Sequence, residues 1–148
     1  MTIPSELFSD ETGQMDQQAV NEQVIRQFRS GGPVEGMRRE RLVLLTTTGR
    51  RSAEPRTVPM MFYPDHAGPV VVASNVGAPH HPAWFLNLEA DPAVTVELPD
   101  ETYGTQAEVL DGAEYERVWA DVTRDFPFFL DHQSKTRRRI PLVRLARS

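Results

Sequence analysis

The pattern of apolar and polar positions predicts a helix from Met15 to about Ser30. Apolar residues recur there every three or four positions, which places them on one helical face: Val20, Val24, Ile25 and Phe28. The glycines and proline at residues 31–33 end the helix. Because its polar face carries acids as well as a base, we expect the helix to lie against the rest of the protein, not on a membrane. We expect residues 1–14, which are mostly polar, to be mobile or loosely docked.

Strand patterns dominate the chain after residue 40. Six segments combine β-branched or alternating apolar residues with flanking turn residues: residues 41–48, 55–63, 69–74, 94–98, 103–109 and 141–146. The first is apolar at consecutive positions, which is typical of a strand buried on both faces. Residues 64–68, rich in Pro and Gly, predict a turn between the second and third strands.

Further helices are predicted between and after these strands. Residues 82–90 begin with a proline suited to a first helical turn and carry an apolar side with Trp84. Residues 111–114 have the form of a capping box. They open a helix whose apolar stripe has the spacing i, i+3, i+4, i+7: Tyr115, Val118, Trp119 and Val122. Pro127 interrupts it, and Phe126, Phe129 and His132 follow at intervals of three.

This order of elements predicts a mostly β fold with flanking helices, of the α+β class. We expect one domain over residues 1–148, with a six-stranded antiparallel split β-barrel as its core at residues 40–146. Six strands with short turns leave no wide pore. A ligand is therefore expected to lie across the outside or at the mouth of the barrel.

Charge is distributed unevenly along the chain, although the net charge is only −5. Residues 37–60 hold 6 arginines and 2 acids, and residues 134–148 hold 5 arginines, one lysine and no acid. Residues 61–133 hold 13 acids and 2 arginines. Local cationic segments in an acidic protein favour a discrete anionic ligand over nucleic acid, which requires a basic face.

Several classes of protein are excluded by composition. The chain has no cysteine, which rules out disulfides, cysteine metal sites and a thiol nucleophile. No apolar run approaches the ~18 residues of a membrane span, and the first residues lack the pattern of a signal peptide. We therefore expect a cytoplasmic protein without an integral membrane span.

The candidate binding chemistry lies at the ends of two predicted strands. After Thr48, a glycine turn carries Arg50, Arg51 and Ser52, and Arg56 opens the next strand. Guanidinium, hydroxyl and backbone N–H groups are the donors that hold phosphate oxygens. A second apolar run ends in Ala73-Ser74-Asn75. Side by side, the two segments would form an anion site next to a flat apolar slot.

Other chemistries receive little support. Adjacent histidines such as His80 and His81 point in different directions, and no acid cluster accompanies them, so we expect no metal site. Ser74 lacks the surroundings of a nucleophile. Neither a P-loop nor a Gly-x-Gly-x-x-Gly sequence is present.

Several motifs occur in a fixed order between about residues 40 and 146: residues 44–52, 55–59, 71–75, 77–88 and 91–96, then Trp119, Phe126-Pro127 and residues 139–141. In this order they resemble the deazaflavin-dependent nitroreductase family of actinobacteria. The resemblance implies a split β-barrel like that of FMN-binding proteins and the coenzyme F420, an 8-hydroxy-5-deazaflavin. The implied activity is hydride transfer from reduced coenzyme F420 to a quinone, nitroaromatic or other planar conjugated acceptor.

By matching position, the resemblance also implies the roles of individual residues. Four would hold the phosphate and acidic tail of the coenzyme: Arg50, Arg51, Ser52 and Arg56. Nine would line the ring edge and linker: Thr57, Val58, Pro59, Met60, Met61, Val72, Ala73, Ser74 and Asn75. Five would flank the deazaflavin: Ala83, Trp84, Phe85, Leu86 and Asn87. Phe129 would cover the substrate side.

Three departures from the family pattern affect the acceptor. Phe126, Phe129 and His132 stand where tyrosines are common, His80 where lysine is common, and Met61 where an aromatic residue occurs. Lost hydroxyls remove donors to an acceptor oxygen, and His132 would donate instead. Two alternatives stay open: an oxidoreductase of the same fold that uses FMN, and a non-catalytic deazaflavin-binding protein. The expected partner is a small apolar acceptor, and a homodimer is possible.

Overall fold

The computed structural model describes residues 13–34 and 36–147. Its helices are α1 (Gly13–Arg29), α2 (Ala83–Ala90), α3 (Gly112–Asp125) and α4 (Phe128–Ser134), with two 3-10 turns, η2 (Arg39–Arg41) and η3 (Asn75–Gly77). Its strands are β1 (Leu42–Thr48), β2 (Pro55–Met61), β3 (Tyr63–Asp65), β4 (Gly68–Val72), β5 (Ala93–Leu98), β6 (Glu101–Gln106), β7 (Glu108–Val109) and β8 (Leu142–Arg144). The expectation for residues 1–14 falls mainly on residues outside this description.

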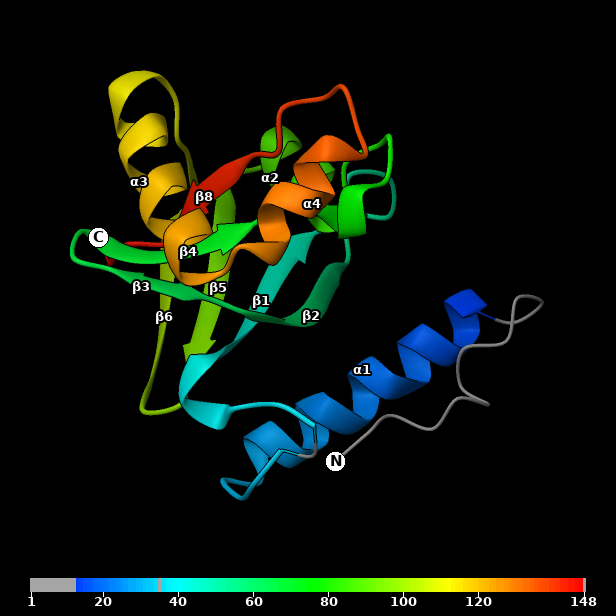
Figure 1. Ribbon diagram of the computed structural model, residues 1–148. Coiled ribbons are helices and arrows are strands. Elements are labelled where there is room, and N and C mark those ends of the chain that lie inside the picture. Colours follow the sequence, from blue (N-terminus) through cyan, green and yellow to red (C-terminus); the bar gives the residue numbers. More distant parts are fainter. Residues whose placement is uncertain (1–12, 35, 148) are drawn as a thin grey trace.

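The strands form two antiparallel sheets (Figure 1). The first sheet has the order β2-β1-β5-β6 and the second the order β3-β4-β8-β7. The α+β class and the antiparallel pairing are confirmed. The six-stranded split barrel is not confirmed, because the backbone hydrogen bonds are divided between two four-stranded sheets.

Two of the six predicted strands are each divided between the sheets. The predicted strand 55–63 breaks at Phe62 into β2 and β3, and 103–109 breaks at Ala107 into β6 and β7. Both break residues pack their side chains against the core. The predicted turn at residues 64–68 correspondingly contains the end of β3, which pairs with β4 through Asp65 and Gly68. Because the side chains at each bend still point into the core, the alternation of apolar and polar residues did not reveal where the strands break.

The main core lies between the sheets. Val43 and Leu45 of β1 meet Val71 of β4 and Val143 of β8 there, all with no exposed surface. Helix α2 contributes Phe85 and covers one end of this core. The opposite face of β1 is buried too, so the prediction of a strand buried on both faces is confirmed.

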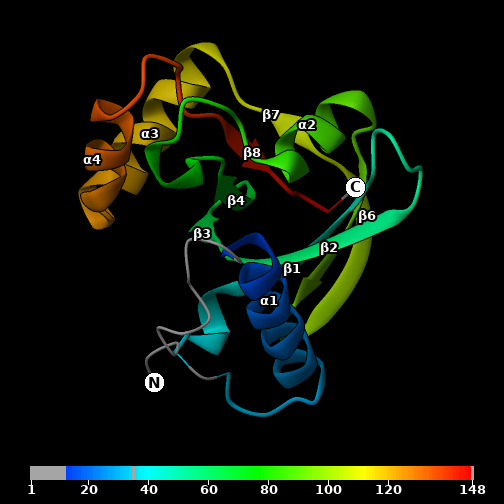
Figure 2. The same ribbon diagram turned by 90° about the vertical axis from the view of Figure 1, so that its right-hand side faces the viewer.

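Helix α1 covers that opposite face of β1. Its apolar residues Val20, Val24 and Phe28 pack with Leu42 and Leu44, as the helical spacing predicted. Figures 1 and 2 show α1 against the first sheet, at the opposite end of the molecule from α3. None of the helices in the described residues has the length and apolar character needed to cross a bilayer.

Helix α3 packs on the outer face of the second sheet. The predicted stripe is confirmed, with Tyr115, Val118 and Val122 buried against Val70 and Leu142. The capping box is wrong in one respect: Asp111 occupies the N-cap position but its side chain makes no capping hydrogen bond. The helix is held instead by packing and by the ion pairs of its first turns.

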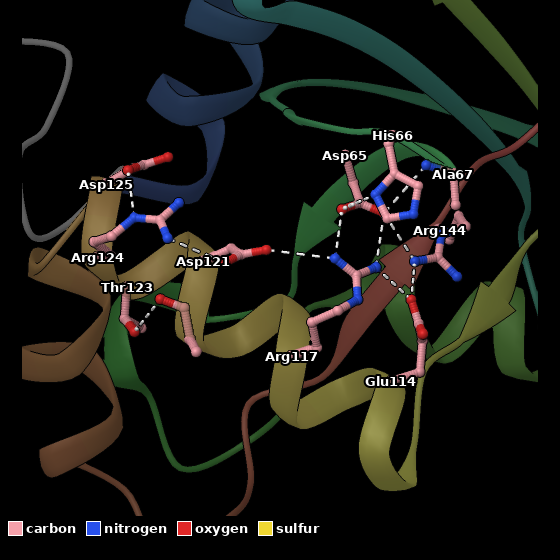
Figure 3. Close-up of polar contacts among 11 residues, drawn as sticks. Asp65, His66, Ala67, Glu114, Arg117, Asp121, Thr123, Arg124, Asp125 and Arg144 are labelled. Atoms are coloured by element: carbon pink, nitrogen blue, oxygen red, sulfur yellow. Dashed lines mark hydrogen bonds and ion pairs between the residues drawn. The ribbon is translucent and has the colours of Figure 1, made fainter.

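Those ion pairs form a partly buried network between α3 and the second sheet (Figure 3). The carboxylate of Asp65 accepts hydrogen bonds from Arg144 at 3.0 Å and from Arg117 at 3.2 Å. Arg144 also donates to Glu114 at 2.7 Å. The side chains of Asp65 and Arg144 are only 3% and 8% exposed, so each charge depends on its partners. A buried charge that loses its partner destabilises a fold strongly.

We predict that Asp65→Asn lowers the free energy of unfolding by about 2–3 kcal/mol. The value lies below the ~3–5 kcal/mol usual for breaking a buried pair, because Glu114 still pairs with Arg144. Urea unfolding measures the change. The matched control is Asp121→Asn, whose partly exposed carboxylate should cost less than about 1 kcal/mol. Equal effects of the two substitutions would contradict the role assigned to Asp65.

The same network makes stability depend on pH. Burial alone raises the pKa of Asp65, but hydrogen bonds from Arg117 and Arg144 outweigh it and lower the pKa from 3.8 to about 2. Because its pKa is lower in the folded than in the unfolded protein, ionised Asp65 stabilises the fold at pH values above its unfolded pKa. This stabilisation is lost as pH falls from about 4 to 2. This part of the acid destabilisation should be absent from Asp65→Asn.

Candidate functional site

A groove of about 1110 Å³ lies where the end of β1, the start of β2 and the segment leading into α2 face helix α1. Eleven residues singled out from the sequence line it: Arg50, Arg51, Ser52, Arg56, Thr57, Val58, Asn75, Ala83, Trp84, Leu86 and Asn87. They come from three separate segments. The fold therefore brings residues of the predicted anion site, Asn75 and part of the predicted ring-flanking segment to one surface.

The tight turn between β1 and β2 contributes cationic residues to the groove. Gly49 donates its N–H to Glu54 O at 2.8 Å, and its carbonyl accepts from Ala53 N at 2.8 Å. A Cβ at Gly49 would lie 2.4 Å from Ser52 Oγ, so a larger residue there would require the Ser52 side chain to move. Ser52 Oγ accepts the N–H of Glu54 at 3.2 Å, which leaves its own proton free to be donated.

Asn87 of α2 anchors this turn from below. Its Oδ1 accepts the backbone N–H of Arg50 at 3.2 Å and the Arg50 guanidinium at 3.3 Å. Its Nδ2 donates to Thr47 Oγ1 at 3.2 Å. Because Asn87 is 5% exposed, these bonds replace water that the amide loses on burial.

Three arginines of the groove, Arg50 and Arg51 of the turn and Arg56 of β2, are not neutralised by acids among the described residues. Arg50 bonds only to uncharged Asn87, and neither Arg51 nor Arg56 forms an ion pair with any carboxylate among the described residues. All three are exposed and border the groove. Such groups bind phosphate or carboxylate oxygens without first breaking an internal pair.

The part of the groove that α2 lines is apolar. Trp84 is partly buried, packs against the core and lies edge-on to Phe85, with ring centroids 6.3 Å apart. Ala83 and Leu86 extend the apolar surface along α2. An aromatic residue held in this way offers a flat face to a conjugated ring.

Other predicted site residues lie outside the groove lining. Pro59, Met60 and Met61 lie further along β2. Val72 ends β4, and Ala73 and Ser74 lead from it to Asn75. Phe85 is 2% exposed and belongs to the core. Met60 packs against the same core. The binding role of every one of these residues stays a prediction.

The two residues predicted to act on the substrate are in α4, which packs against η3. Phe129 is partly buried against the α3 cluster, and its ring centroid lies 4.3 Å from that of Phe128. His132 Nδ1 lies 3.2 Å from Ser74 Oγ, next to groove residue Asn75. Neither α4 residue lines the groove itself.

Sequence reasoning missed the contribution of α1 to the groove. The groove is also lined by Gln17, Gln18, Asn21, Glu22 and Ile25. Four of these positions looked like an ordinary solvated helix face, and Ile25 was expected on the apolar face. Only the packing of α1 beside β2 brings them to the site. Among the described residues, no three His, Asp or Glu side chains gather closely enough to hold a metal ion.

Comparison with known proteins identifies close relatives. Residues 19–146 match the family described as F420H(2)-dependent quinone reductase. The F420H(2)-dependent quinone reductase Rv1261c of Mycobacterium tuberculosis is 33% identical over 108 residues, which cover 71% of this chain and 72% of the relative.

Two solved structures are similar as well. An F420-H2 dependent reductase, FDR-A, superposes with a TM-score of 0.63 and is 36% identical. The superposition covers 70% of this chain and 91% of FDR-A. A domain-swapped dimer superposes with a TM-score of 0.65 at 29% identity and covers 90% of this chain and 96% of its own.

We predict that Asn87→Ala lowers the free energy of unfolding by about 1–3 kcal/mol, the range for leaving buried partners unsatisfied. The amide of Arg50 should also exchange with solvent faster, because it loses its acceptor. Thermal or urea unfolding and amide exchange measure the two effects. The matched control is Asn21→Ala, a surface substitution expected to change stability by less than about 0.5 kcal/mol. Unchanged exchange at Arg50 would show that Asn87 does not anchor the turn.

Proposed function

This chain belongs to the F420H(2)-dependent quinone reductase family, and we propose that its groove is the site where reduced coenzyme F420 passes a hydride to a quinone. It is thus an F420-dependent oxidoreductase, as the resemblance to an actinobacterial deazaflavin-dependent family implied. We propose nitroaromatic and other planar conjugated compounds as further hydride acceptors. One observation carries the proposed function: three arginines without acidic partners among the described residues and a partly buried tryptophan line the same groove.

The residues of the groove fit a coenzyme with an anionic tail and a conjugated ring. Arg50, Arg51 and Arg56 would hold phosphate and carboxylate oxygens, with Ser52 Oγ as a further donor. Trp84 would flank the ring. When bound, the reduced deazaflavin supplies a hydride instead of single electrons. The protein's contribution is to orient the ring and to exclude water.

The linker and ring edge would lie along the segments beside this groove. Thr57 and Val58 line it directly, and we assign residues 59–61 and 72–75 to the same boundary on the basis of their positions in the family pattern. Asn75 supports that assignment because it lines the groove and its Nδ2 donates to the His80 carbonyl at 3.1 Å, which ties the ends of the loop together.

We assign the acceptor to the end of the groove near Asn75, beside α4. Phe129 would cover the acceptor, and His132 would donate a hydrogen bond or proton to its oxygen as hydride arrives. The packing of α4 on η3 supports this placement, as does the position of His132 at 3.2 Å from Ser74 Oγ. Phenylalanine supplies only packing, so acceptors that need little proton assistance should be preferred.

The proposal also includes the location and the oligomeric state of the enzyme. We propose that the enzyme acts in the cytoplasm, as expected from the sequence. We also propose a homodimer, which is supported by the similar structure that is a domain-swapped dimer.

We predict that the protein binds coenzyme F420 and binds FMN much more weakly, and that Arg56→Ala weakens F420 binding by roughly 1.5–3 kcal/mol. The reason is that Arg56 offers a charge-assisted hydrogen bond free of any internal partner. The loss should shrink at high salt, where the attraction is screened. Fluorescence titration with each coenzyme at two salt concentrations measures both effects.

The control for this titration is Arg124→Ala, which removes an exposed arginine of α3 and should leave binding unchanged. Comparable or tighter FMN binding would favour an FMN enzyme of the same fold. Tight F420 binding without turnover of any quinone would favour a coenzyme-binding protein.

We predict that Phe129→Tyr raises turnover of a nitroaromatic by about 10- to 100-fold and leaves coenzyme affinity nearly unchanged. A phenol in place of the phenyl ring would assist the acceptor oxygen, and general-acid help is worth ~10²-fold when geometry is right. The measurement is kcat on one nitroaromatic and one quinone at saturating reduced coenzyme. The partner variant is His132→Ala. If the tyrosine adds nothing and His132→Ala abolishes turnover, His132 already supplies the proton; if neither changes turnover, the acceptor does not lie beside α4.

A further inference from the structure

Arg138, which follows α4, holds the loop that forms one wall of the groove. Its Nε donates to Ala78 O at 2.9 Å, and Nη1 and Nη2 donate to Ala73 O and Ser74 O at 3.1 and 2.6 Å. No carboxylate among the described residues pairs with it. Three neutral carbonyls thus fix one orientation of the guanidinium, whose planar donor geometry allows little adjustment.

The same guanidinium also contacts His81, which lines the groove. The distance from Arg138 Nη1 to His81 Nδ1 is 3.0 Å. A guanidinium has only N–H donors and does not lose its proton in proteins, so Nδ1 must be the acceptor. An imidazole that accepts at Nδ1 carries its proton on Nε2 when it is neutral.

We propose that His81 is a specificity-determining hydrogen-bond donor of the groove: Arg138 holds it as the neutral Nε2–H tautomer, and Nε2 donates to a carbonyl oxygen of a bound ring. The inference rests on the proposed function, because that carbonyl belongs either to the coenzyme or to the quinone.

The position of the ring supports this role. His81 lies between the loop held by Arg138 and Pro82, which starts α2, and its ring packs against Phe85 with centroids 4.8 Å apart and planes 55° apart. No described residue accepts a hydrogen bond from its Nε2. One nitrogen is therefore held by the protein while the other is left for a ligand.

The electrostatic surroundings favour the neutral form. Burial lowers the pKa of His81 and the Arg138 charge lowers it further, while Glu89 of α2 opposes both without reversing the direction. A neutral donor suits a carbonyl oxygen, whereas the arginines that line the same groove suit anionic oxygens. A site built around such a donor rejects ring compounds that lack the matching acceptor, because the donor is then left unpaired.

Nitrogen-15 NMR of labelled histidine tests the first half of the proposal on the intact protein. The long-range proton–nitrogen pattern distinguishes the two tautomers and the protonated ring. We expect His81 at pH 7 to be the Nε2–H tautomer, and Arg138→Lys, whose amine cannot reproduce the fork, to give a mixture. A protonated ring or the Nδ1–H tautomer in the wild-type protein would overturn the proposal.

Binding and turnover of two His81 variants test the second half. His81→Phe keeps a flat ring but has no donor, and should raise the F420 dissociation constant or the quinone KM about five- to tenfold, the effect of one lost hydrogen bond. His81→Gln keeps an N–H donor and should restore most of the loss. The control pair, His66→Phe and His66→Gln, changes an exposed histidine in the turn between β3 and β4 and should have no effect.

The two measurements, the F420 dissociation constant and the quinone KM, show whether the carbonyl belongs to the coenzyme or to the quinone. A changed dissociation constant assigns it to the coenzyme, and a changed KM alone assigns it to the quinone. If the wild-type protein binds F420 and reduces quinones but His81→Phe does the same equally well, the inference fails and the proposed function stands. If the wild-type protein binds no F420, both fail.

Discussion

The structure depends on one strand that is buried on both faces. Residues Leu42–Leu45 have no exposed surface; two of them face the core between the sheets and two face α1. At ~1.5–3 kcal/mol for each large apolar side chain, their burial is worth roughly 6–12 kcal/mol. That is comparable with the net stability of a typical domain, about 5–15 kcal/mol. Sheets, core and helix α1 all require this strand to be in place.

A strand that is apolar on both faces is not held in register by alternation, because a shift of one residue exchanges one buried side chain for another. Here the register is specified at its polar end. Thr46 Oγ1 lies 2.7 Å from Thr57 Oγ1 on β2, and Thr47 accepts from Asn87. Gly49 then closes the turn through backbone hydrogen bonds with Ala53 and Glu54. The groups that shape the groove thus also align the strand, and the candidate site and the fold share the same constraint.

The arginines divide into three environments with different physical consequences. Arg144 is buried and paired with carboxylates, so it stabilises the packing of α3. Arg138 is surrounded by carbonyl oxygens and one imidazole nitrogen, so its charge orients a loop and a histidine. Arg51 and Arg56 are exposed beside the groove and form no ion pair with described residues, so they are the ones suited to an anionic ligand. An acidic protein can therefore have a local anion site, because the arginines beside the groove are not used in internal ion pairs.

The sequence by itself determined the local elements and the types of group in the groove. Helical spacing in residues 20–28 and 115–122, the apolar run at residues 42–45, and the arginines of the glycine turn depend on neighbours a few positions away, and such patterns are legible in one dimension. The tertiary structure alone decided the rest. It broke two predicted strands at Phe62 and Ala107, where inward side chains continue through the bend, and so produced two sheets instead of a barrel. It brought α1 to the groove and placed Arg138 against His81, 57 positions away. Contacts over such distances in the chain follow from how the layers pack, and no local pattern encodes them.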